Sequence, residues 1–377
     1  MNVVQPETPA DLARTLADAA GSGRAIRCGG NFTKDKIAGP LAAADVTIST
    51  AGLRRVLHYE PRDLTISVEA GLPYAEFRRL LAGNRQMVPL DPPFAETATV
   101  GGVVAANHSG PRRRLFGSAR DFVIGMTFAT LEGKLVQSGG MVVKNVAGLD
   151  MGKLMIGSFG TLAAIAVVNF KLVPMPPASR TFAMQFPTAA AVIDRRNQIL
   201  SGVLQPVALD IVSPRTSALL GLEGFALLLQ ATGNPAVIDR YSRELPDART
   251  IERDEEQLLW EKIREYTPEF IAREPAGAIA RVSVRLSDLR LVLESAPVEA
   301  VARAGNGVCY VYLPNSQTAA QWSAEAQGRG WRYALEYSTT GLDRWPNPGS
   351  DFEMMVKVKE MFDPQRLLNR GRLYGRI

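Results

Sequence analysis

The segment that decides the fold is a short strand followed by a glycine loop, Ala25-Ile26-Arg27-Cys28-Gly29-Gly30-Asn31-Phe32-Thr33-Lys34. The apolar start predicts a strand over residues 25–27, and the paired glycines predict a tight turn after it. Successive backbone N–H groups in such a turn form a nest that binds anions. The loop alone is not specific, so its meaning depends on the rest of the chain.

A second glycine loop follows at Thr99-Val100-Gly101-Gly102-Val103-Val104-Ala105-Ala106-Asn107-His108-Ser109-Gly110. Twelve of the chain's 33 glycines lie between Gly101 and Gly160. Glycine allows positive φ and a close approach of the backbone to a ligand, so the clustering favours a region that cradles a ligand. A set of tight hairpin turns would explain the same clustering.

The first half of the chain alternates helix and strand signals before and after these loops. Thr8 and Pro9 predict the start of a helix, and Leu12 and Leu16 form its apolar face. Strands are predicted over 46–50 and 64–69, and a helix over 73–82. The proline-rich stretch at 174–177 is the best domain boundary in the chain.

In the second half of the chain, apolar strand segments alternate with helical segments. This pattern predicts an α+β domain, an antiparallel sheet with helices on one side. No internal repeat of fixed period is visible in it. The expected strands are 182–186, 225–230, 278–286 and 308–313. The expected helices are 235–245, 254–266 and 287–294.

Composition narrows the chemistry. The 377 residues include only two histidines, His58 and His108, and two cysteines, Cys28 and Cys309. A cysteine-rich zinc site, an iron–sulfur cluster held by this chain and a histidine-rich metal site are therefore excluded, and no metal is expected. The net charge of +5 is weak evidence for a polyanionic partner. Acidic residues near the N-terminus argue against a signal peptide, and the longest uncharged stretch, 154–170, is too short for a membrane span, so a cytoplasmic protein is expected.

Several cofactor-binding, catalytic and nucleic-acid-binding motifs are absent from the sequence or incomplete in it. A GxGxxG fingerprint after a strand, a GxSxG elbow and an HExxH helix are absent from the sequence. The run from Gly148 to Lys153 is one residue short of a Walker loop, and Leu154 stands where a magnesium-binding hydroxyl belongs. The basic run Arg112–Arg114, with Arg120, has few aromatic neighbours and is interpreted as a turn facing solvent or a ligand.

Taken in order, the glycine loops and their surroundings resemble the FAD-binding domain of the PCMH-type (vanillyl-alcohol-oxidase) flavoproteins. Within that family they look most like the FAD-binding subunits of bacterial glycolate oxidases. The resemblance covers residues 1–175 and returns at 361–364 and 369–372. The segments that carry it are 29–34, 68–71, 89–93, 99–102, 109–113, 117–125, 143–148 and 157–165.

The resemblance implies an FAD site built from matching motif positions. Residues Gly29, Gly30, Asn31, Phe32, Thr33 and Lys34 would hold the diphosphate. Thr99, Gly101, Gly102, Ser109 and Gly110 would line the diphosphate and the ribityl or flavin side. Gly160, Leu162 and Ile165 would approach the adenosine end, and Asn369 would reach the flavin ring edge. The remaining expected contacts are Pro89, Asn107, Ser118 and Asp121, and the last two could instead cap the next helix.

The resemblance also implies an organisation and partners. It places the PCMH-type FAD-binding domain, two α+β subdomains, at 1–175. An α+β, ferredoxin-like cap domain spans 176–340, and a C-terminal segment returning to the flavin spans 341–377. The expected function is that of the FAD-binding subunit of a glycolate or other 2-hydroxy acid oxidase complex. A related catalytic flavin subunit, an iron–sulfur subunit and peripheral membrane contact through these partners are part of that expectation.

Catalytic residues are not identified by the sequence. The chain from 176 to 377 contains no histidine, although a 2-hydroxy acid oxidase needs a cation for the carboxylate and a base for the hydroxyl. Arg281, Arg285 or Arg332 could supply the cation. The tyrosines Tyr310, Tyr312, Tyr333 and Tyr337 are weaker candidates for a catalytic role, and His108 is a candidate for covalent attachment of FAD.

Two alternatives stay open at this point. The chain could be a self-sufficient oxidoreductase for another hydroxy acid or alcohol. It could also be a non-enzymatic nucleic-acid-binding or scaffold module that uses Arg112–Arg114, and such a module would be colourless.

Overall fold

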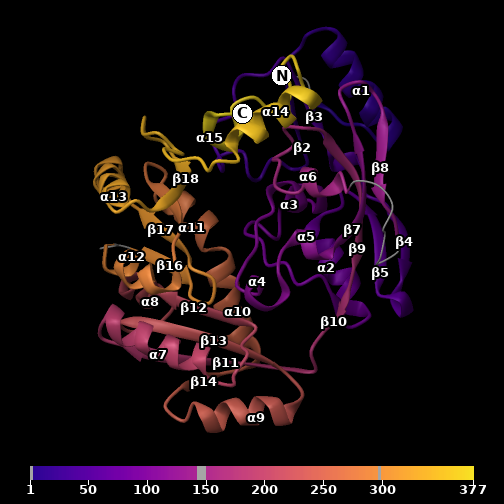
Figure 1. The fold of residues 1–377 in the computed structure, drawn as a ribbon. Coiled ribbons are helices and arrows are strands. Elements are labelled where there is room, and N and C mark those ends of the chain that lie inside the picture. Colours follow the sequence, from indigo (N-terminus) through magenta and orange to yellow (C-terminus); the bar gives the residue numbers. More distant parts are fainter. Residues whose placement is uncertain (1–2, 142–149, 296–298) are drawn as a thin grey trace. The chain divides into compact units, whose positions relative to one another are not determined.

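The computed structural model describes residues 3–141, 150–295 and 299–377. The segment 143–148, which contributes to the resemblance, therefore lies outside the described residues. The chain divides into two compact units (Figure 1). The first comprises residues 1–109, 118–175 and 348–377, and the second comprises 110–117 and 176–347. The sequence predicted the change of unit after 175, but assigned 110–117 to the first domain and began the C-terminal segment at 341.

The first glycine loop follows a strand of a small parallel sheet in the first unit. Its strand order is β1 (Val3–Val4), β3 (Val46–Ser49), β2 (Ile26–Gly29). Helix α1 (Pro9–Gly21) begins as predicted, with the Thr8 hydroxyl accepting a hydrogen bond from the Asp11 backbone N–H at 3.1 Å. Its buried face, which includes Leu12 and Leu16, packs into a core shared with Ile26 and Ile48. Strand β2 runs two residues further than predicted and delivers Gly29 directly into the loop.

An antiparallel five-stranded sheet forms the rest of this unit's framework. Its order is β4 (Val56–Glu60), β5 (Thr65–Glu69), β9 (Ala164–Lys171), β7 (Val123–Ala129), β8 (Leu135–Gly139). Strand β9 is buried along nearly its whole length because it lies in the centre of the sheet. The other elements between residues 74 and 174 are α2 (Tyr74–Gly83), β6 (Gln86–Met87), α3 (Val100–Ala106), α4 (Arg113–Phe116), α5 (Ala119–Phe122), α6 (Gly152–Met155) and β10 (Val173–Pro174), of which α4 belongs to the second unit.

The end of the chain rejoins the first unit. Helix α14 (Phe352–Phe362) leads to a turn, and the short helix α15 (Arg372–Gly375) follows. Between them, Ile26 donates its N–H to Leu367 O at 2.8 Å, and Asn369 donates its N–H to Ile26 O at the same distance. The C-terminal segment is thus hydrogen-bonded alongside strand β2, next to the first glycine loop.

The second unit contains one antiparallel sheet of eight strands, in the order β14-β11-β13-β12-β16-β17-β15-β18. The strands are β11 (Ala178–Phe186), β12 (Ala208–Val212), β13 (Phe225–Gly233), β14 (Arg249–Ile251), β15 (Ala278–Ser283), β16 (Glu299–Arg303), β17 (Val308–Leu313) and β18 (Arg332–Ser338). The helices are α7 (Ala189–Ser201), α8 (Pro214–Leu219), α9 (Pro235–Glu244), α10 (Arg253–Arg264), α11 (Tyr266–Arg273), α12 (Leu289–Ser295) and α13 (Ser316–Gly328).

This sheet consists of two ferredoxin-like halves. Each half follows the order β-α-β-β-α-β. The first half is β11, α7, β12, β13, α9 and β14, with the additional short helix α8 between β12 and β13, and the second half is β15, α12, β16, β17, α13 and β18. The halves join where β12 pairs antiparallel with β16, the second strand of each. The ferredoxin-like prediction is confirmed, but the duplication escaped the sequence analysis, because the two halves share a topology without a visible sequence period.

Helices cover both faces of this sheet, whereas the sequence predicted one covered face. Helices α7, α9, α12 and α13 pack one face through a core that includes Val192, Ile238 and Trp322. Helices α10 and α11 lie on the other face, where Glu256 of α10 accepts a hydrogen bond from Thr181 of β11 at 2.8 Å. Among the described residues, every helix is too short or too polar to span a lipid bilayer.

Candidate functional site

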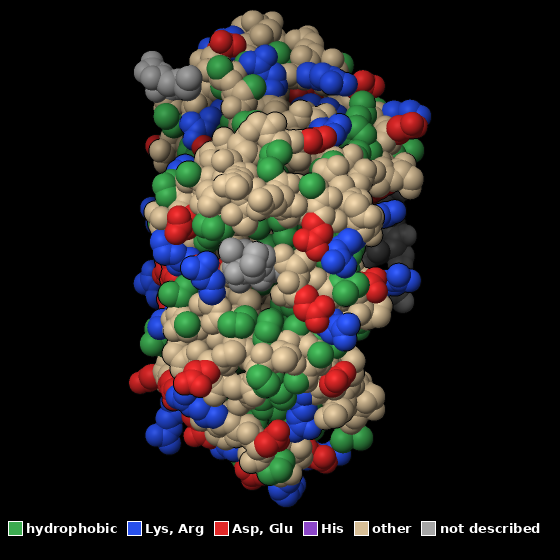
Figure 2. Space-filling view, turned by 90° about the vertical axis from the view of Figure 1, so that its left-hand side faces the viewer, with side chains coloured by type: hydrophobic (Ala, Val, Ile, Leu, Met, Phe, Trp, Pro, Cys, Tyr) green, Lys and Arg blue, Asp and Glu red, His purple; other side chains and the backbone are tan. Residues whose placement is uncertain are grey.

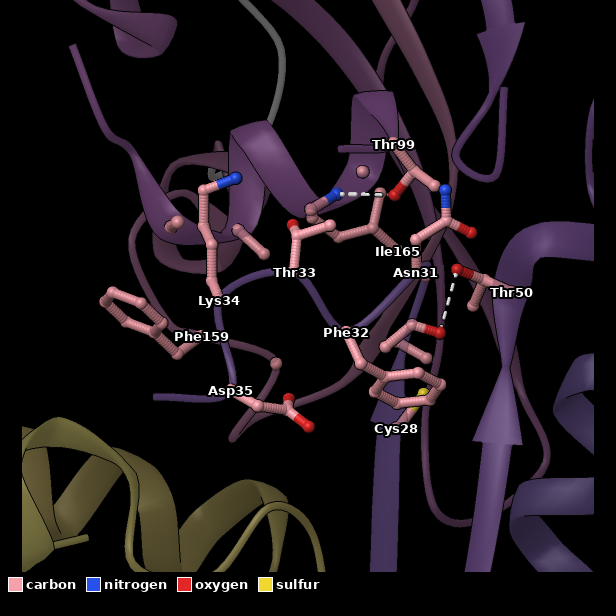
Figure 3. A pocket seen from close by; sticks show the side chains of 18 of the residues that line it. Cys28, Asn31, Phe32, Thr33, Lys34, Asp35, Thr50, Thr99, Phe159 and Ile165 are labelled. Carbon is pink, nitrogen blue, oxygen red and sulfur yellow. Dashed lines mark hydrogen bonds between the residues drawn. The ribbon is translucent and has the colours of Figure 1, made fainter. Parts of the chain in front are cut away.

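A cavity in the first unit brings together both glycine loops and the turn before β9 (Figure 3). It is lined by Cys28, Gly29, Gly30, Asn31, Phe32, Thr33, Lys34, Asp35, Thr50, Thr99, Gly101, Gly102, Ala105, Ala106, Phe159, Gly160, Ala163, Ala164, Ile165 and Arg372. The whole predicted diphosphate loop is therefore on one wall, with Thr99, Gly101, Gly102, Gly160 and Ile165 around it. Strands β2 and β9 and helix α3 supply the rigid elements from which these residues project.

Two carbonyl groups of the first loop accept hydrogen bonds from side chains at and just after the end of β3. Ser49 donates its hydroxyl to Gly30 O at 3.0 Å. Thr50 donates its hydroxyl to Gly29 O at 3.3 Å (Figure 3). Phe32 adopts a left-handed conformation with φ of 56°. Within the described chain, no hydrogen bond is recorded for the backbone N–H groups of 31, 32 and 33. The carbonyls are thus satisfied by the protein while N–H donors stay available, which is the arrangement of an anion nest.

Close packing explains why this loop needs its glycines. A Cβ on Gly30 would lie 2.2 Å from the Thr99 hydroxyl oxygen, so the two predicted loops touch at this point. A Cβ on Gly29 would lie 3.0 Å from the ring of Phe32. That ring in turn stacks under Arg27, whose guanidinium carbon is 4.2 Å from the ring centroid. Phe32 therefore contacts the loop and the Arg27 side chain.

Positively charged side chains lie at the C-terminal end of the first glycine loop. Lys34 and Arg372 line the cavity and are each only 7% exposed. Asp35, which also lines it, forms ion pairs with both Arg27 and Arg372. Two guanidinium groups share one carboxylate, and Lys34 adds a third cation, so the local balance is positive. Such a balance favours an anionic ligand group, and a diphosphate carries concentrated negative charge.

Arg372 was not among the predicted contacts, although it is the last residue of the segment 369–372 that carries the resemblance. Its Nη1 donates to Ile37 O at 2.6 Å and to Lys34 O at 3.0 Å, so it ties down the end of the first loop. Burial lowers its pKa, and Asp35 opposes that shift. Its Nε is buried and has no hydrogen-bond partner among the described residues. Arg372 thus both positions the loop and brings a cation to the cavity wall.

Asn369 joins three backbone segments around the same cavity. Its Oδ1 accepts from Cys28 N at 2.8 Å, and its Nδ2 donates to Cys28 O at 2.9 Å. The same Nδ2 lies 3.2 Å from Phe159 O and 3.0 Å from Gly160 O. These partners use the amide in the protein itself. Asn369 is absent from the cavity lining, so the structure gives it the role of a clamp between the loop and the turn at 159–160.

A buried ion pair supports this clamp from behind. Lys359 of α14 is 2% exposed, and its Nζ lies 2.6 Å from Asp363 Oδ2. The same Nζ donates to Thr161 O at 2.8 Å and to Leu368 O at 3.0 Å. Burial lowers the pKa of Lys359, and Asp363 opposes that shift. The pair therefore fixes the helix, the C-terminal turn and the residue after Gly160 in one arrangement.

The second predicted loop is mostly a helix. Thr99 caps α3 by accepting a hydrogen bond from Gly102 N at 3.2 Å, and Asn107 ends it with φ of 48°. The turn after α3 leaves two buried polar atoms, Asn107 Oδ1 and Ser109 Oγ, without a recorded partner in the part of the chain that the structure describes. Buried polar atoms of this kind ordinarily bind something, and here a ligand is the expected partner. His108 lies beside Phe159, with 5.9 Å between ring centroids, and is not among the lining residues.

Other predicted contacts lie outside this cavity. The Asp121 carboxylate accepts from Ser118 N at 2.8 Å, so these two residues form the helix cap that the sequence left open as the alternative. Pro89 and Leu162 are buried in the first unit and are not among the lining residues. Gly110 belongs to the second unit. His58 is exposed on β4, and no described group of His, Cys, Asp and Glu could hold a metal ion.

Comparisons with known proteins agree with this site. Residues 2–139 match a family model described as an FAD binding domain. The glycolate oxidase subunit GlcE of Escherichia coli (strain K12) is 29% identical over 86% of this chain and 86% of that protein. A D-lactate dehydrogenase of Archaeoglobus fulgidus is 26% identical over 76% of this chain and 72% of that protein. A solved structure of alkyldihydroxyacetonephosphate synthase covers 97% of this chain and 76% of its own, with a TM-score of 0.75 and 16% identity, and so supports the fold alone.

These matches agree with the predicted resemblance to the PCMH-type FAD-binding flavoproteins: residues 2–139 match an FAD binding domain, and most of the chain is similar to a glycolate oxidase subunit. The chain is an FAD-dependent oxidoreductase, and the predictions of family, fold class and cofactor are confirmed.

The residues present fit the cofactor. The nest at 31–33 and the buried cations line the cavity and are complementary to a molecule that carries a diphosphate. The unsatisfied atoms of Asn107 and Ser109 follow helix α3, and these two residues are not among the lining residues. When bound, FAD supplies two-electron redox chemistry, and the protein supplies binding, orientation and electrostatics. In this chain the loop N–H groups would bind the diphosphate, Lys34 and Arg372 would balance its charge, and Asn369 would hold both walls in position.

Proposed function

We propose that this chain is the FAD-binding subunit of a multi-subunit enzyme that oxidises a small 2-hydroxy acid, with glycolate as the first candidate. The cavity built from the two glycine loops and Arg372 is the observation that carries the proposal. The names of the similar proteins, a glycolate oxidase subunit and a D-lactate dehydrogenase, support the substrate class.

The division of labour within the complex follows from the composition of the second unit. Residues 176–347 contain no histidine, the most common general base in enzymes. We therefore assign most of the substrate chemistry to a related flavin subunit and onward electron transfer to an iron–sulfur subunit. This chain would bind FAD and take part in the electron path, and it would meet the membrane, if at all, through its partners.

The charge distribution is consistent with a protein that does not use a broad basic surface. On the face that Figure 2 shows, basic and acidic side chains are interspersed rather than gathered by sign. Arg114 of the predicted basic run is directed inward within the second unit, where its Nη1 donates to Pro206 O at 2.7 Å. This contact removes one member of the run from any nucleic-acid surface.

The test is to purify the chain alone and record its flavin spectrum under anaerobic conditions before and after adding glycolate or D-lactate. We expect a yellow protein whose flavin bleaches slowly or not at all until the partner subunits are added. Rapid bleaching by either acid would favour the self-sufficient oxidoreductase instead. A colourless protein with salt-sensitive DNA binding would favour the nucleic-acid module.

A further inference from the structure

A row of polar side chains crosses the second unit's sheet on the face away from the apolar core. Asp210 of β12 stands directly opposite Arg303 of β16, and Arg281 of β15 stands directly opposite Tyr310 of β17. Directly paired residues in an antiparallel ladder project to the same side of the sheet and interact. On the same strands the alternate residues, among them Ala280 and Val311, belong to the apolar core on the other face.

A β-bulge adds a carboxylate to the end of this row. Strand β18 pairs Leu335 with Ala280 and Tyr337 with Ile279, so Glu336 is an extra residue between two consecutive pairs. Bulges re-aim side chains and are frequent next to functional sites. The Glu336 side chain is 7% exposed, and its Oε1 lies 3.8 Å from Arg281 Nε. Burial raises the pKa of Glu336, and Arg281 opposes that shift.

The row contains two arginine–carboxylate pairs of different character. Arg303 and Asp210 are in close hydrogen-bonded contact, with side chains 12% and 1% exposed. Arg281 and Glu336 are further apart than a hydrogen bond, and the Arg281 side chain is 34% exposed. The first pair is closed and has a structural role. In the second pair the Arg281 side chain is partly exposed whereas Glu336 is buried, and Arg281 also forms a hydrogen bond with the Tyr310 side chain. A buried carboxyl beside a guanidinium and a phenol on one sheet face is an arrangement typical of a binding site.

The side chains at the β18 end of the row, those of Arg281, Tyr310 and Glu336, match the parts of one small molecule. A guanidinium binds a carboxylate through two parallel N–H donors. A buried carboxyl and a phenol can both exchange hydrogen bonds with an alcohol. The pKa of Tyr310 is raised mainly by burial, so its phenol stays protonated and able to donate near neutral pH.

We propose that Arg281, Tyr310 and Glu336 form a binding site for a small 2-hydroxycarboxylate. The guanidinium of Arg281 holds the carboxylate, and Glu336 and Tyr310 contact the hydroxyl. The inference deepens the proposed function and rests on its substrate class. Arg281 was one of three arginines that the sequence analysis considered. Arg285 is 86% exposed beside Asp288, and Arg332 is exposed at the start of β18.

The experiment measures glycolate binding to the FAD-loaded chain after the flavin has been reduced anaerobically, so that no turnover occurs. An NMR titration would compare glycolate with acetate, which lacks the hydroxyl. We expect glycolate to bind more tightly than acetate, and Arg281→Gln to weaken both by about 10- to 100-fold. Glu336→Gln should reduce the preference for glycolate over acetate. The matched control Arg285→Gln should change neither affinity.

Wild-type affinity in Arg281→Gln, or an unchanged glycolate preference in both Glu336→Gln and Tyr310→Phe, would overturn the site. If Arg281→Gln does not fold, Arg281→Lys replaces it, and retained wild-type affinity there would overturn the two-donor geometry. A yellow protein that binds no glycolate would refute this inference and leave FAD binding intact. A colourless protein that binds glycolate would refute the proposed function and leave the site.

Discussion

The side-chain amide of Asn369 pairs with both backbone groups of Cys28, 341 residues earlier in the chain. Oδ1 accepts from Cys28 N at 2.8 Å, and Nδ2 donates to Cys28 O at 2.9 Å. The two contacts continue the hydrogen bonding of β2 onto the C-terminal segment. The position of the start of the first glycine loop therefore depends on a residue near the C-terminal end of the chain.

Replacing Asn369 should therefore release FAD without any direct loss of a cofactor contact. Asn369→Ala leaves the N–H and C=O of Cys28 and two further carbonyls without their partner. We expect folding stability to fall by about 1–3 kcal/mol and FAD occupancy to drop strongly. Flavin absorbance per protein and thermal melting measure both effects. Arg370→Ala, an exposed neighbour, is the control, and full occupancy in Asn369→Ala would contradict the clamp.

The paired glycines of α3 should respond differently to the same substitution. A Cβ on Gly101 would lie 2.6 Å from the Cβ of Ala70, inside the protein, whereas a Cβ on Gly102 would meet only the Thr99 hydroxyl, at 3.2 Å. Gly101→Ala should destabilise the fold, because overpacking against a buried neighbour costs about 1–3 kcal/mol. Gly102→Ala should keep the melting temperature within a few degrees and weaken FAD binding. Equal loss of stability in the two variants would contradict this assignment.

The ion pair of Lys359 and Asp363 should be among the most sensitive positions. Lys359→Met removes the cation and leaves a fully buried carboxylate, which still accepts from Leu367 N and Leu368 N. Breaking a buried pair by removing one partner costs about 3–5 kcal/mol. Denaturant unfolding would measure the loss. The exposed pair of Arg366 and Glu360 is the control, and Arg366→Met should change stability by less than about 1 kcal/mol.

The thiol of Cys28 should be unreactive in the native protein. Burial raises its pKa from 9.0 to about 12, and the Cys309 thiol is raised to the same value. Thiolate is the reactive form, so at pH 8 each should react with iodoacetamide roughly 1000-fold more slowly than in the unfolded chain. Because the folded state keeps these protons longer, the stability they contribute is full below about pH 9 and is lost as the pH rises towards 12. Cys309 is buried and Cys28 is half-buried at the cavity wall, and rapid alkylation of either thiol in the native protein at pH 8 would refute its raised pKa.

Much of the candidate site follows from local sequence. Glycine pairs after a strand, Thr99 at a helix start and the segment at 159–165 each have local signatures, and the cavity contains all three. Asn369 and Arg372 could not be interpreted in the same way. Their hydrogen bonds go to backbone atoms far away in the chain, and backbone atoms leave no trace in the residue pattern.

The sequence by itself determined the cofactor class, the α+β character of both halves and the absence of a histidine-based catalytic centre in residues 176–347. These properties depend on residue identity and short spacing. Only the tertiary structure decided that Asn369 is a clamp, that the second unit is a doubled ferredoxin-like sheet and that Glu336 lies beside Arg281. Each of these depends on pairing between segments that are distant in the chain, and the place of Glu336 depends on the bulge in β18. The register between strands is set by packing of the whole sheet.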